Sequence, residues 1–332
     1  MNIAVLGSGS WGTALAMLLL ENGHDVTLWA RSAAHAAQMA KTHENPRLSG
    51  VTLPDGLNFT SDIACAAGKE LVVLAVPSFA VRETARAAAP HLSQGALPVC
   101  VAKGIERGTS LRLSQVAEQE LGRACAVLSG PSHAEEVARG LPTGCVAACA
   151  DLKRVQVVQD AFMSERFRVY ASADPVGVEL GGALKNIIAL CAGVSDGMGL
   201  GDNTKALLMT RGLTELARLT MALGGRRETV AGLSGVGDLI VTCTSMHSRN
   251  RRAGILIGQG KTARQAMEEV GAVVEGYYAA ASARELAQKS GVEMPITEQV
   301  YEVLYEGKDP HAVPAALMTR TRKNELEDAG WQ

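Results

Sequence analysis

Lys185 has the surroundings expected of a lysine that takes part in chemistry. Between Leu180 and Ser195 no other side chain is charged at neutral pH. Its neighbours on one face of a helix are all small: Gly181, Gly182, Ala189 and Ala192. Such a stripe lets another surface approach, and partial burial lowers a lysine pKa, which is the usual route to an acid/base lysine. The alternative is a lysine that extends to solvent at the edge of a domain.

Asp238 is the natural partner of this lysine. It is the only acidic residue between Glu228 and Glu268, and it lies between the glycine-rich residues 232–237 and the apolar residues 239–241. Because buried charges persist when they are paired, a lone aspartate and a lone lysine in such segments predict a common cavity. The alternative is an aspartate that caps a helix after a glycine-rich turn.

Two segments place hydrogen-bond donors where an anion could bind. Lys103 follows the apolar run Leu97–Ala102, which predicts a strand that ends at the edge where doubly wound sheets bind ligands. Gly130 follows another predicted strand, and Ser132 with Glu135 has the spacing of a capping box that opens a helix with free N–H groups. Capping alone would also explain Ser132.

Ser248, Arg249 and Asn250 form a third polar group. The forked guanidinium of Arg249 beside the amide of Asn250 suits a phosphate dianion. The alternative is a solvated helix face, because the arginine run continues through Arg251 and Arg252.

The N-terminal residues predict an element that holds a dinucleotide. Asn2–Leu6 is a buried strand, the next six residues have the pattern Gly-x-Gly-x-x-Gly, and an apolar helix leads to a second strand, Asp25–Trp29. Gly7 permits the tight turn, Gly9 lets backbone N–H groups approach a pyrophosphate, and Gly12 lets the helix pack closely on the strand. The βαβ spacing strengthens a motif that is weak by itself.

Arg31 indicates which dinucleotide is bound. An NAD site usually has an acidic residue after the second strand for the ribose 2′-hydroxyl, whereas this chain has Ala30 and Arg31. A guanidinium there favours a 2′-phosphate, so we expect NADPH to be preferred and NAD to be usable. The alternative is a surface arginine with no part in cofactor choice.

The remaining pattern divides the chain near residue 173. Up to that point apolar runs alternate with helical ones and predict strands at Leu71–Val76, Leu97–Ala102, Cys125–Leu128, Gly144–Ala148 and Arg168–Ala171. Beyond it the periodic segments are helical, and Asn203 is expected to cap the start of one. We therefore expect an α/β protein. Residues 1–172 would form a doubly wound, Rossmann-type, mostly parallel sheet domain that binds NAD(P), and residues 173–332 an all-helical substrate and catalytic domain.

The bulk composition excludes several classes of protein. The 332 residues are 47% hydrophobic and 20% charged with a net charge of −2, so no nucleic-acid partner is expected. The apolar residues 14–20 fall short of a membrane span, which needs about 20 residues. The chain begins on its first strand, so we expect no leader segment and a cytoplasmic location. The seven cysteines show no metal-ligand spacing; we expect buried thiols and no metal site.

Taken together, these segments resemble the bacterial NAD(P)-dependent glycerol-3-phosphate dehydrogenases over nearly the whole chain. The most specific segment runs from Gly182 through Lys185 to Asn203, with support from residues 130–132, 232–238 and 248–250. The resemblance implies reversible, NAD(P)H-dependent reduction of dihydroxyacetone phosphate to sn-glycerol 3-phosphate, which supplies glycerophospholipid synthesis. The sequence does not determine the oligomeric state, and a homodimer is one alternative.

The resemblance also implies roles for individual residues. Lys185 would be the catalytic acid/base. The residues around glycerol phosphate would be Lys103, Gly130, Ser132, Lys185, Asp238, Ser248, Arg249 and Asn250. The residues around the dinucleotide would be Gly7, Gly9, Ser10, Trp11, Gly12, Arg31, Lys103, Ala134, Arg249, Val273 and Glu275. Val273 and Glu275 come from the resemblance alone, and the segment Asn45–Pro54 matches the family loosely, without a defined role.

Two alternative functions stay open at this point. Other two-domain NADP dehydrogenases, such as those that act on β-hydroxyacids, also use a lysine on a helix; residues 232–238 and 248–250 distinguish this chain from them. A non-catalytic NADP sensor would have no reason to keep an isolated lysine in an apolar helix. Oxidation of the nicotinamide in the presence of dihydroxyacetone phosphate would separate an enzyme from a sensor.

Overall fold

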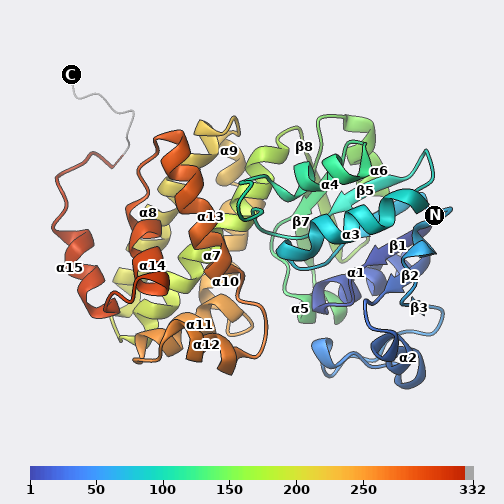
Figure 1. The fold of residues 1–332 in the computed structure, drawn as a ribbon, viewed down its shortest axis with the longest axis horizontal. Helices are drawn as coiled ribbons and strands as arrows, with labels where there is room; N and C mark the ends of the chain where they lie inside the picture. The colour runs from blue at the N-terminus through green and yellow to red at the C-terminus, as the bar shows by residue number, and fades with distance from the viewer. Residues whose placement is uncertain (326–332) are drawn as a thin grey trace.

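The computed structural model describes residues 1–325, whose first half is built around an eight-stranded sheet (Figure 1). The strands are β1 (Asn2–Leu6), β2 (Asp25–Trp29), β3 (Asn58–Thr60), β4 (Leu71–Leu74), β5 (Leu97–Cys100), β6 (Ala126–Ser129), β7 (Thr143–Ala148) and β8 (Phe167–Ser172). Their order is β3-β2-β1-β4-β5-β6-β7-β8, and neighbours run parallel except β6 and β7. From β1 the strand order proceeds to β2 on one side and to β4 on the other. This arrangement confirms the predicted doubly wound sheet.

Helices cover both faces of this sheet because alternate strand residues supply two cores. These helices are α1 (Ser10–Glu21), α2 (Ala33–Thr42), α3 (Val81–Ala88), α4 (Leu113–Leu121), α5 (Ala134–Ala138) and α6 (Leu152–Phe162). In β1, Ile3 and Val5 join one core with α1, α2, α5 and α6, whereas Ala4 and Leu6 join the other with α3 and α4. A strand covered on both faces is apolar throughout, which explains the unbroken apolar runs in the sequence.

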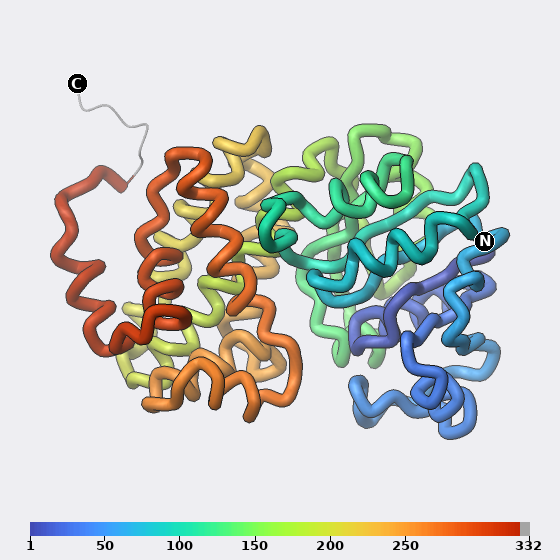
Figure 2. Tube along the Cα trace, viewed as in Figure 1, coloured from blue at the N-terminus to red at the C-terminus, as the bar shows by residue number. Residues whose placement is uncertain are grey.

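Up to residue 325, the regular elements of the second half are all helices. Its helices are α7 (Pro175–Gly197), α8 (Gly201–Ala222), α9 (Arg227–Val230), α10 (Asp238–Thr244), α11 (Arg249–Gly258), α12 (Ala263–Val270), α13 (Glu275–Ser290), α14 (Pro295–Tyr305) and α15 (Val313–Met318). The blue-to-green sheet half and the yellow-to-red helical half lie side by side in Figure 2. This architecture confirms the predicted fold class.

The central helix of the second half is α7. Pro175 occupies its first turn, and the Asp174 side chain accepts a hydrogen bond from the Gly177 N–H at 2.9 Å, which explains where the helix begins. Helices α8, α10, α11 and α13 all pack against it. By length and composition alone α7 could cross a membrane, but 94% of its most apolar 18-residue stretch is buried inside the fold.

Three local features differ from the sequence-based expectations. Asn203 does not cap a helix, because α8 already begins at Gly201. Ser132 and Glu135 form no capping box: α5 begins at Ala134, and its N-cap residue His133 makes no side-chain capping bond. Strand β3 was not predicted, because its three residues form no apolar run and pair only along the edge of the sheet.

Glu179 ties α7 to the sheet domain. Its buried carboxylate accepts hydrogen bonds from the backbone N–H of Ser114 at 2.8 Å and from the Ser114 hydroxyl at 2.7 Å, and it pairs with the Arg112 guanidinium. Ser114 lies in the first turn of α4, so a carboxylate of one half accepts from one of the free N–H groups of a helix in the other. Burial raises the pKa of Glu179, and the Arg112 charge and the Ser114 hydrogen bonds oppose that increase.

We expect Glu179→Ala to lower the free energy of unfolding by about 3 to 5 kcal/mol, because it leaves buried donors and the Arg112 charge without their partner. Urea denaturation measures the loss. The control is Glu268→Ala, which removes an exposed pair with Arg264 and should cost less than about 1 kcal/mol. If the two variants lose the same free energy of unfolding, the buried contact of Glu179 stabilises the fold no more than an exposed ion pair does.

Candidate active site

Helices α7 and α10 bring Lys185 and Asp238 together. The Lys185 Nζ lies 2.7 Å from Asp238 Oδ1, and the two residues are 6% and 1% exposed. The Asp238 side chain does not cap α10, whose N-cap residue is Gly237. The lone lysine and the lone aspartate are therefore paired, as predicted, and the solvent-exposed alternative for Lys185 is wrong.

Burial lowers the pKa of Lys185 to about 8, even though the Asp238 carboxylate opposes the shift; the charge of Lys103 adds to it. A lysine in this range exchanges a proton near neutral pH, whereas an ordinary lysine stays fully charged. The arrangement thus gives Lys185 the property required of an acid/base group.

Thr242 is a polar residue of the cluster that sequence reasoning missed. It lies one turn after Asp238 on α10, and its Oγ1 accepts a hydrogen bond from the Lys185 Nζ at 2.5 Å. Its own hydroxyl donates to the Asp238 carbonyl at 2.6 Å, as threonine often does within a helix. The spacing of four residues from Asp238 was the only signal in the sequence, because it places both side chains on one helix face.

Lys103 approaches Asp238 from the sheet domain. Its Nζ donates to Asp238 Oδ2 at 2.5 Å, to the Ser132 Oγ at 2.6 Å and to the Gly130 carbonyl at 2.9 Å. An ammonium has three N–H donors. Lys103 uses all three in these bonds. Lys185 uses two, in its bonds to Asp238 and Thr242, and its third donor is left for a ligand. Asp238 bridges two lysines, and the cluster has a net charge of +1 when both are protonated. Such a cluster favours an anion or a developing alkoxide.

Ser248 and Asn250 have structural partners. The Ser248 hydroxyl caps α11 by accepting from the Arg251 N–H at 3.2 Å. The buried Asn250 amide donates to Asn186 Oδ1 at 2.8 Å and accepts from the Gly276 N–H at 2.8 Å, so it joins α7, α11 and α13. Because Asn186 follows Lys185 on α7, this network lies beside the lysine cluster. Direct contact between Asn250 and a phosphate stays a prediction.

The three arginines of this segment do not form one solvated face. Arg249 is exposed at the start of α11. Arg251 is engaged elsewhere, since its guanidinium pairs with Asp196 at 2.8 Å. Arg249 therefore differs from Arg251, which is held in an ion pair. Arg249 lies near enough to Glu275 for its positive charge to lower the pKa of that carboxyl.

The glycine-rich turn has room for a pyrophosphate. A Cβ at Gly7 would lie 2.5 Å from the Ala75 carbonyl oxygen, and one at Gly12 would lie 2.0 Å from the Gly7 carbonyl oxygen, so both positions require glycine. A Cβ at Gly9 would meet no atom within 4 Å, which leaves open space in front of α1. Ser10 and Trp11 form the first turn of that helix, whose N-cap Gly9 offers no side-chain bond. The residues present fit a dinucleotide with its phosphates at the α1 N-terminus.

The other proposed cofactor residues lie in both halves. Arg31 is exposed just after β2, and Ala134 begins α5. Val273 and Glu275 lie at the start of α13, where Glu275 Oε2 accepts from the Ser78 hydroxyl at 2.7 Å. Ser78 follows β4, so this bond spans the two halves. Burial raises the pKa of Glu275, whereas the Ser78 bonds and the Arg249 charge lower it.

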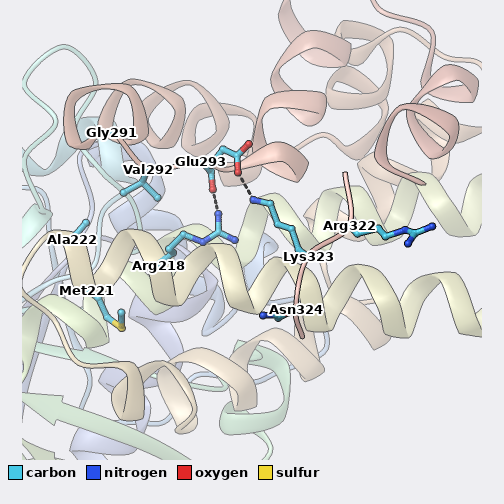
Figure 3. Close-up of a pocket in the computed structure, with 9 residues that line it drawn as sticks. All are labelled: Arg218, Met221, Ala222, Gly291, Val292, Glu293, Arg322, Lys323 and Asn324. Carbon is cyan, nitrogen blue, oxygen red and sulfur yellow. Dashed lines mark hydrogen bonds and ion pairs between the residues drawn. The ribbon is translucent and has the colours of Figure 1, made fainter. Parts of the chain in front are cut away.

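A hollow of about 970 Å³ lies apart from this cluster, between α8 and the C-terminal segment (Figure 3). Its lining residues are Arg218, Met221, Ala222, Gly291, Val292, Glu293, Arg322, Lys323 and Asn324. The Glu293 carboxylate pairs with Lys323 at 2.5 Å, and the Glu293 carbonyl accepts from Arg218. No proposed site residue lines this hollow, so it is not the candidate active site.

Comparison with known protein families shows which family this chain belongs to. A family model described as "NAD-dependent glycerol-3-phosphate dehydrogenase N-terminus" matches residues 2–155, and one described as the C-terminus of that enzyme matches residues 174–315. The chain belongs to the NAD-dependent glycerol-3-phosphate dehydrogenase family. The lysine cluster lies where the two matched segments meet, since Lys103 comes from the first and both Lys185 and Asp238 come from the second.

Individual relatives agree with this membership of the glycerol-3-phosphate dehydrogenase family. A protein of Moorella thermoacetica named glycerol-3-phosphate dehydrogenase [NAD(P)+] is 57% identical, and the alignment covers 99% of each chain. The crystal structure of the Coxiella burnetii glycerol-3-phosphate dehydrogenase superposes with a TM-score of 0.92 at 40% identity, over 96% of this chain and 99% of that one. A Ralstonia eutropha protein of the ketopantoate reductase family shares only the fold, at 15% identity, a TM-score of 0.62 and coverage of 95% and 100%. Fold alone therefore does not select the substrate.

Proposed function

We propose that this chain is an NAD(P)-dependent glycerol-3-phosphate dehydrogenase that reversibly reduces dihydroxyacetone phosphate to sn-glycerol 3-phosphate, with Lys185 as the catalytic acid/base. The observation that supports this most directly is the buried Lys103–Asp238–Lys185 cluster, in which one carboxylate bridges ammonium groups from both halves of the molecule. Reduction of a ketone requires stabilisation of a developing alkoxide and delivery of a proton, and this cluster can do both. The product would supply glycerophospholipid synthesis.

Each residue of the cluster has a distinct task in this proposal. The bound nicotinamide supplies the hydride. The remaining N–H donor of Lys185 binds the ketone oxygen and delivers its proton to it. Asp238 and Thr242 hold the Lys185 ammonium in position through their bonds of 2.7 and 2.5 Å. Lys103, fixed by Gly130 and Ser132, holds the Asp238 carboxylate in position through the bond to its Oδ2.

Arg249 is proposed to hold the substrate phosphate, with Ser248 and Asn250 around it. Its support is an exposed guanidinium at the start of α11, on a helix that the Asn250 amide ties to the residue after Lys185. A guanidinium binds a phosphate dianion through two parallel bonds. Binding energy from this distant group would orient the ketone toward Lys185.

The proposal is tested by an assay of nicotinamide oxidation with NADPH and NADH, each offered dihydroxyacetone phosphate, free dihydroxyacetone and a β-ketoacid. We expect turnover with the phosphorylated ketone and much slower turnover with the other two. Turnover of the β-ketoacid alone would place the chain with the β-hydroxyacid enzymes. Binding of NADPH without turnover of any ketone would favour a redox sensor.

NADPH is the proposed preferred cofactor, because Arg31 lies exposed at the carboxyl end of β2 and Ala30 offers no carboxylate. We expect Arg31→Ala to lower kcat/KM for NADPH by about tenfold or more and to change that for NADH little, since a charge-assisted contact is worth roughly 1.5 to 3 kcal/mol. Steady-state kinetics with both cofactors measure the change. Equal losses with NADPH and NADH would show that Arg31 does not contact the 2′-phosphate.

Location and assembly complete the proposal. We propose that the enzyme is cytoplasmic. A homodimer is proposed because β8 is an edge strand whose Tyr170 is 52% exposed, and such an edge offers a surface for a second copy. Light scattering on the purified protein gives the mass of the assembly directly.

A further inference from the structure

Asn45 connects a segment without a defined role to the glycine-rich turn. It precedes the short helix η1 (Pro46–Leu48), between α2 and β3, and only 1% of it is exposed. Its Nδ2 donates to the Ser8 carbonyl at 3.1 Å and to the Thr13 hydroxyl at 2.8 Å. Its Oδ1 accepts from the Arg47 N–H at 3.0 Å, which holds its own segment in place.

The two acceptors lie at opposite ends of the turn. Ser8 lies just after Gly7, and Thr13 lies at the end of the first turn of α1, where its N–H bonds to the Gly9 carbonyl at 2.9 Å. Both residues are buried, Ser8 at 5% and Thr13 at 0% exposure. One amide group therefore spans the turn that has to hold the phosphates.

This contact sets the direction of backbone donors. A trans peptide is planar, so the carbonyl of Ser8 and the N–H of Gly9 point in opposite directions. When Asn45 holds the Ser8 carbonyl on one side, the Gly9 N–H is directed to the opposite side. A Cβ at Gly9 would meet no atom within 4 Å, so the backbone of Gly9 is open to a ligand. The Thr13 bond fixes the start of α1 in the same frame, and with it the free N–H groups of Ser10 and Trp11.

We propose that Asn45 is a positioning residue for the dinucleotide, which holds the Gly7–Gly12 turn so that its N–H groups converge on the pyrophosphate. The inference rests on the proposed function. The pyrophosphate is common to NADH and NADPH, so Asn45 contributes equally to both, whereas Arg31 acts on the 2′-phosphate alone. The segment Asn45–Pro54 thereby gains a role as the support of the phosphate turn.

The test is Asn45→Asp, which keeps the side-chain shape and the acceptor for the Arg47 N–H and replaces the donor by an oxygen that the Ser8 carbonyl repels. We expect the dissociation constants of NADH and NADPH, measured by nicotinamide fluorescence, to rise by the same factor of about ten or more. At saturating cofactor, kcat and KM for dihydroxyacetone phosphate should change less than twofold. The matched control is Asn58→Asp, whose amide makes an exposed bond to Asp25 at 3.2 Å and which should bind both cofactors as wild type does.

A pH series separates positioning from a general loss of structure. A buried aspartate is protonated more readily than an exposed one, and its neutral form can again donate to the Ser8 carbonyl. Binding of NAD+, which has no 2′-phosphate to titrate, should therefore recover in Asn45→Asp relative to wild type and Asn58→Asp as the pH falls from 8 to 5.5. The comparison with wild type is needed because the His35 ring, which bonds to the Ser8 backbone, and the charge of Arg47 also act at this turn. Calorimetry measures this recovery.

Thr13→Val provides a second variant that keeps volume and removes only one of the two bonds, so we expect a smaller, several-fold rise for both cofactors. If Asn45→Asp does not fold, this variant decides the outcome by itself. Unchanged affinity in every folded variant would overturn the inference while leaving the proposed function intact. Wild-type protein that binds neither dinucleotide would instead overturn the proposed function.

Discussion

Lys185→Met is expected to abolish turnover while NADPH still binds. Methionine keeps the length of the side chain but has no donor for the ketone oxygen and no proton to deliver. Since general acid catalysis contributes about 10² to 10⁴-fold, kcat should fall at least that far. The same measurement on Lys153→Met, which changes an exposed lysine of α6, should give wild-type rates.

Two further readouts connect this effect to the lysine itself. The Lys185 ammonium is the form that donates a proton, and its pKa is lowered to about 8 chiefly by burial. Reduction of the ketone should therefore slow as the pH rises through about 8, and oxidation of the alcohol should speed up over the same range. Nicotinamide fluorescence should show unchanged NADPH binding in Lys185→Met. A folded variant that is saturable with dihydroxyacetone phosphate and nearly as fast as wild type would move the chemistry to another residue.

Arg249→Ala is expected to remove most of the preference for the phosphorylated ketone. Wild type should strongly prefer dihydroxyacetone phosphate to dihydroxyacetone, because only the former presents a dianion to the guanidinium. A charge-assisted bond is worth roughly 1.5 to 3 kcal/mol, so kcat/KM for the phosphorylated ketone should fall about tenfold to a hundredfold. The value for the free ketone should change much less.

The comparison needs an exposed arginine that is not one of the proposed site residues. Arg264 on α12 is such a residue, since within residues 1–325 its ion pair is with Glu268 on its own helix, and Arg264→Ala should leave both ketones unaffected. Arg251 is unsuitable, because its pair with Asp196 holds α11 against α7. If Arg249→Ala leaves the preference between the ketones intact, the phosphate has to be assigned instead to Lys103 and the residues around Ser132.

The sequence alone was sufficient where a property depends on neighbours along the chain. Gly7 follows from its backbone φ of +128° and Gly12 from its close approach to the Gly7 carbonyl oxygen, and the apolar runs of the strands follow from burial on both faces of a sheet. The isolation of Lys185 among small residues was enough to predict its burial. Local pattern was less successful at helix starts, as Asn203 and Ser132 show, because polar residues near a helix end have several partners to choose from.

Only the tertiary structure decided which distant groups share a partner. Lys103 and Asp238 are 135 positions apart, and the doubly wound sheet and the packing of α7 against α10 bring them to 2.5 Å. Neither residue's own surroundings in the sequence reveal that one carboxylate serves two lysines. The contacts of Asn45 could not be predicted from the sequence either, because its two acceptors lie 37 and 32 positions away. A hydrogen bond between side chains depends on position to within a few tenths of an ångström, and that position is set by the packing of whole elements rather than by residues nearby in the chain.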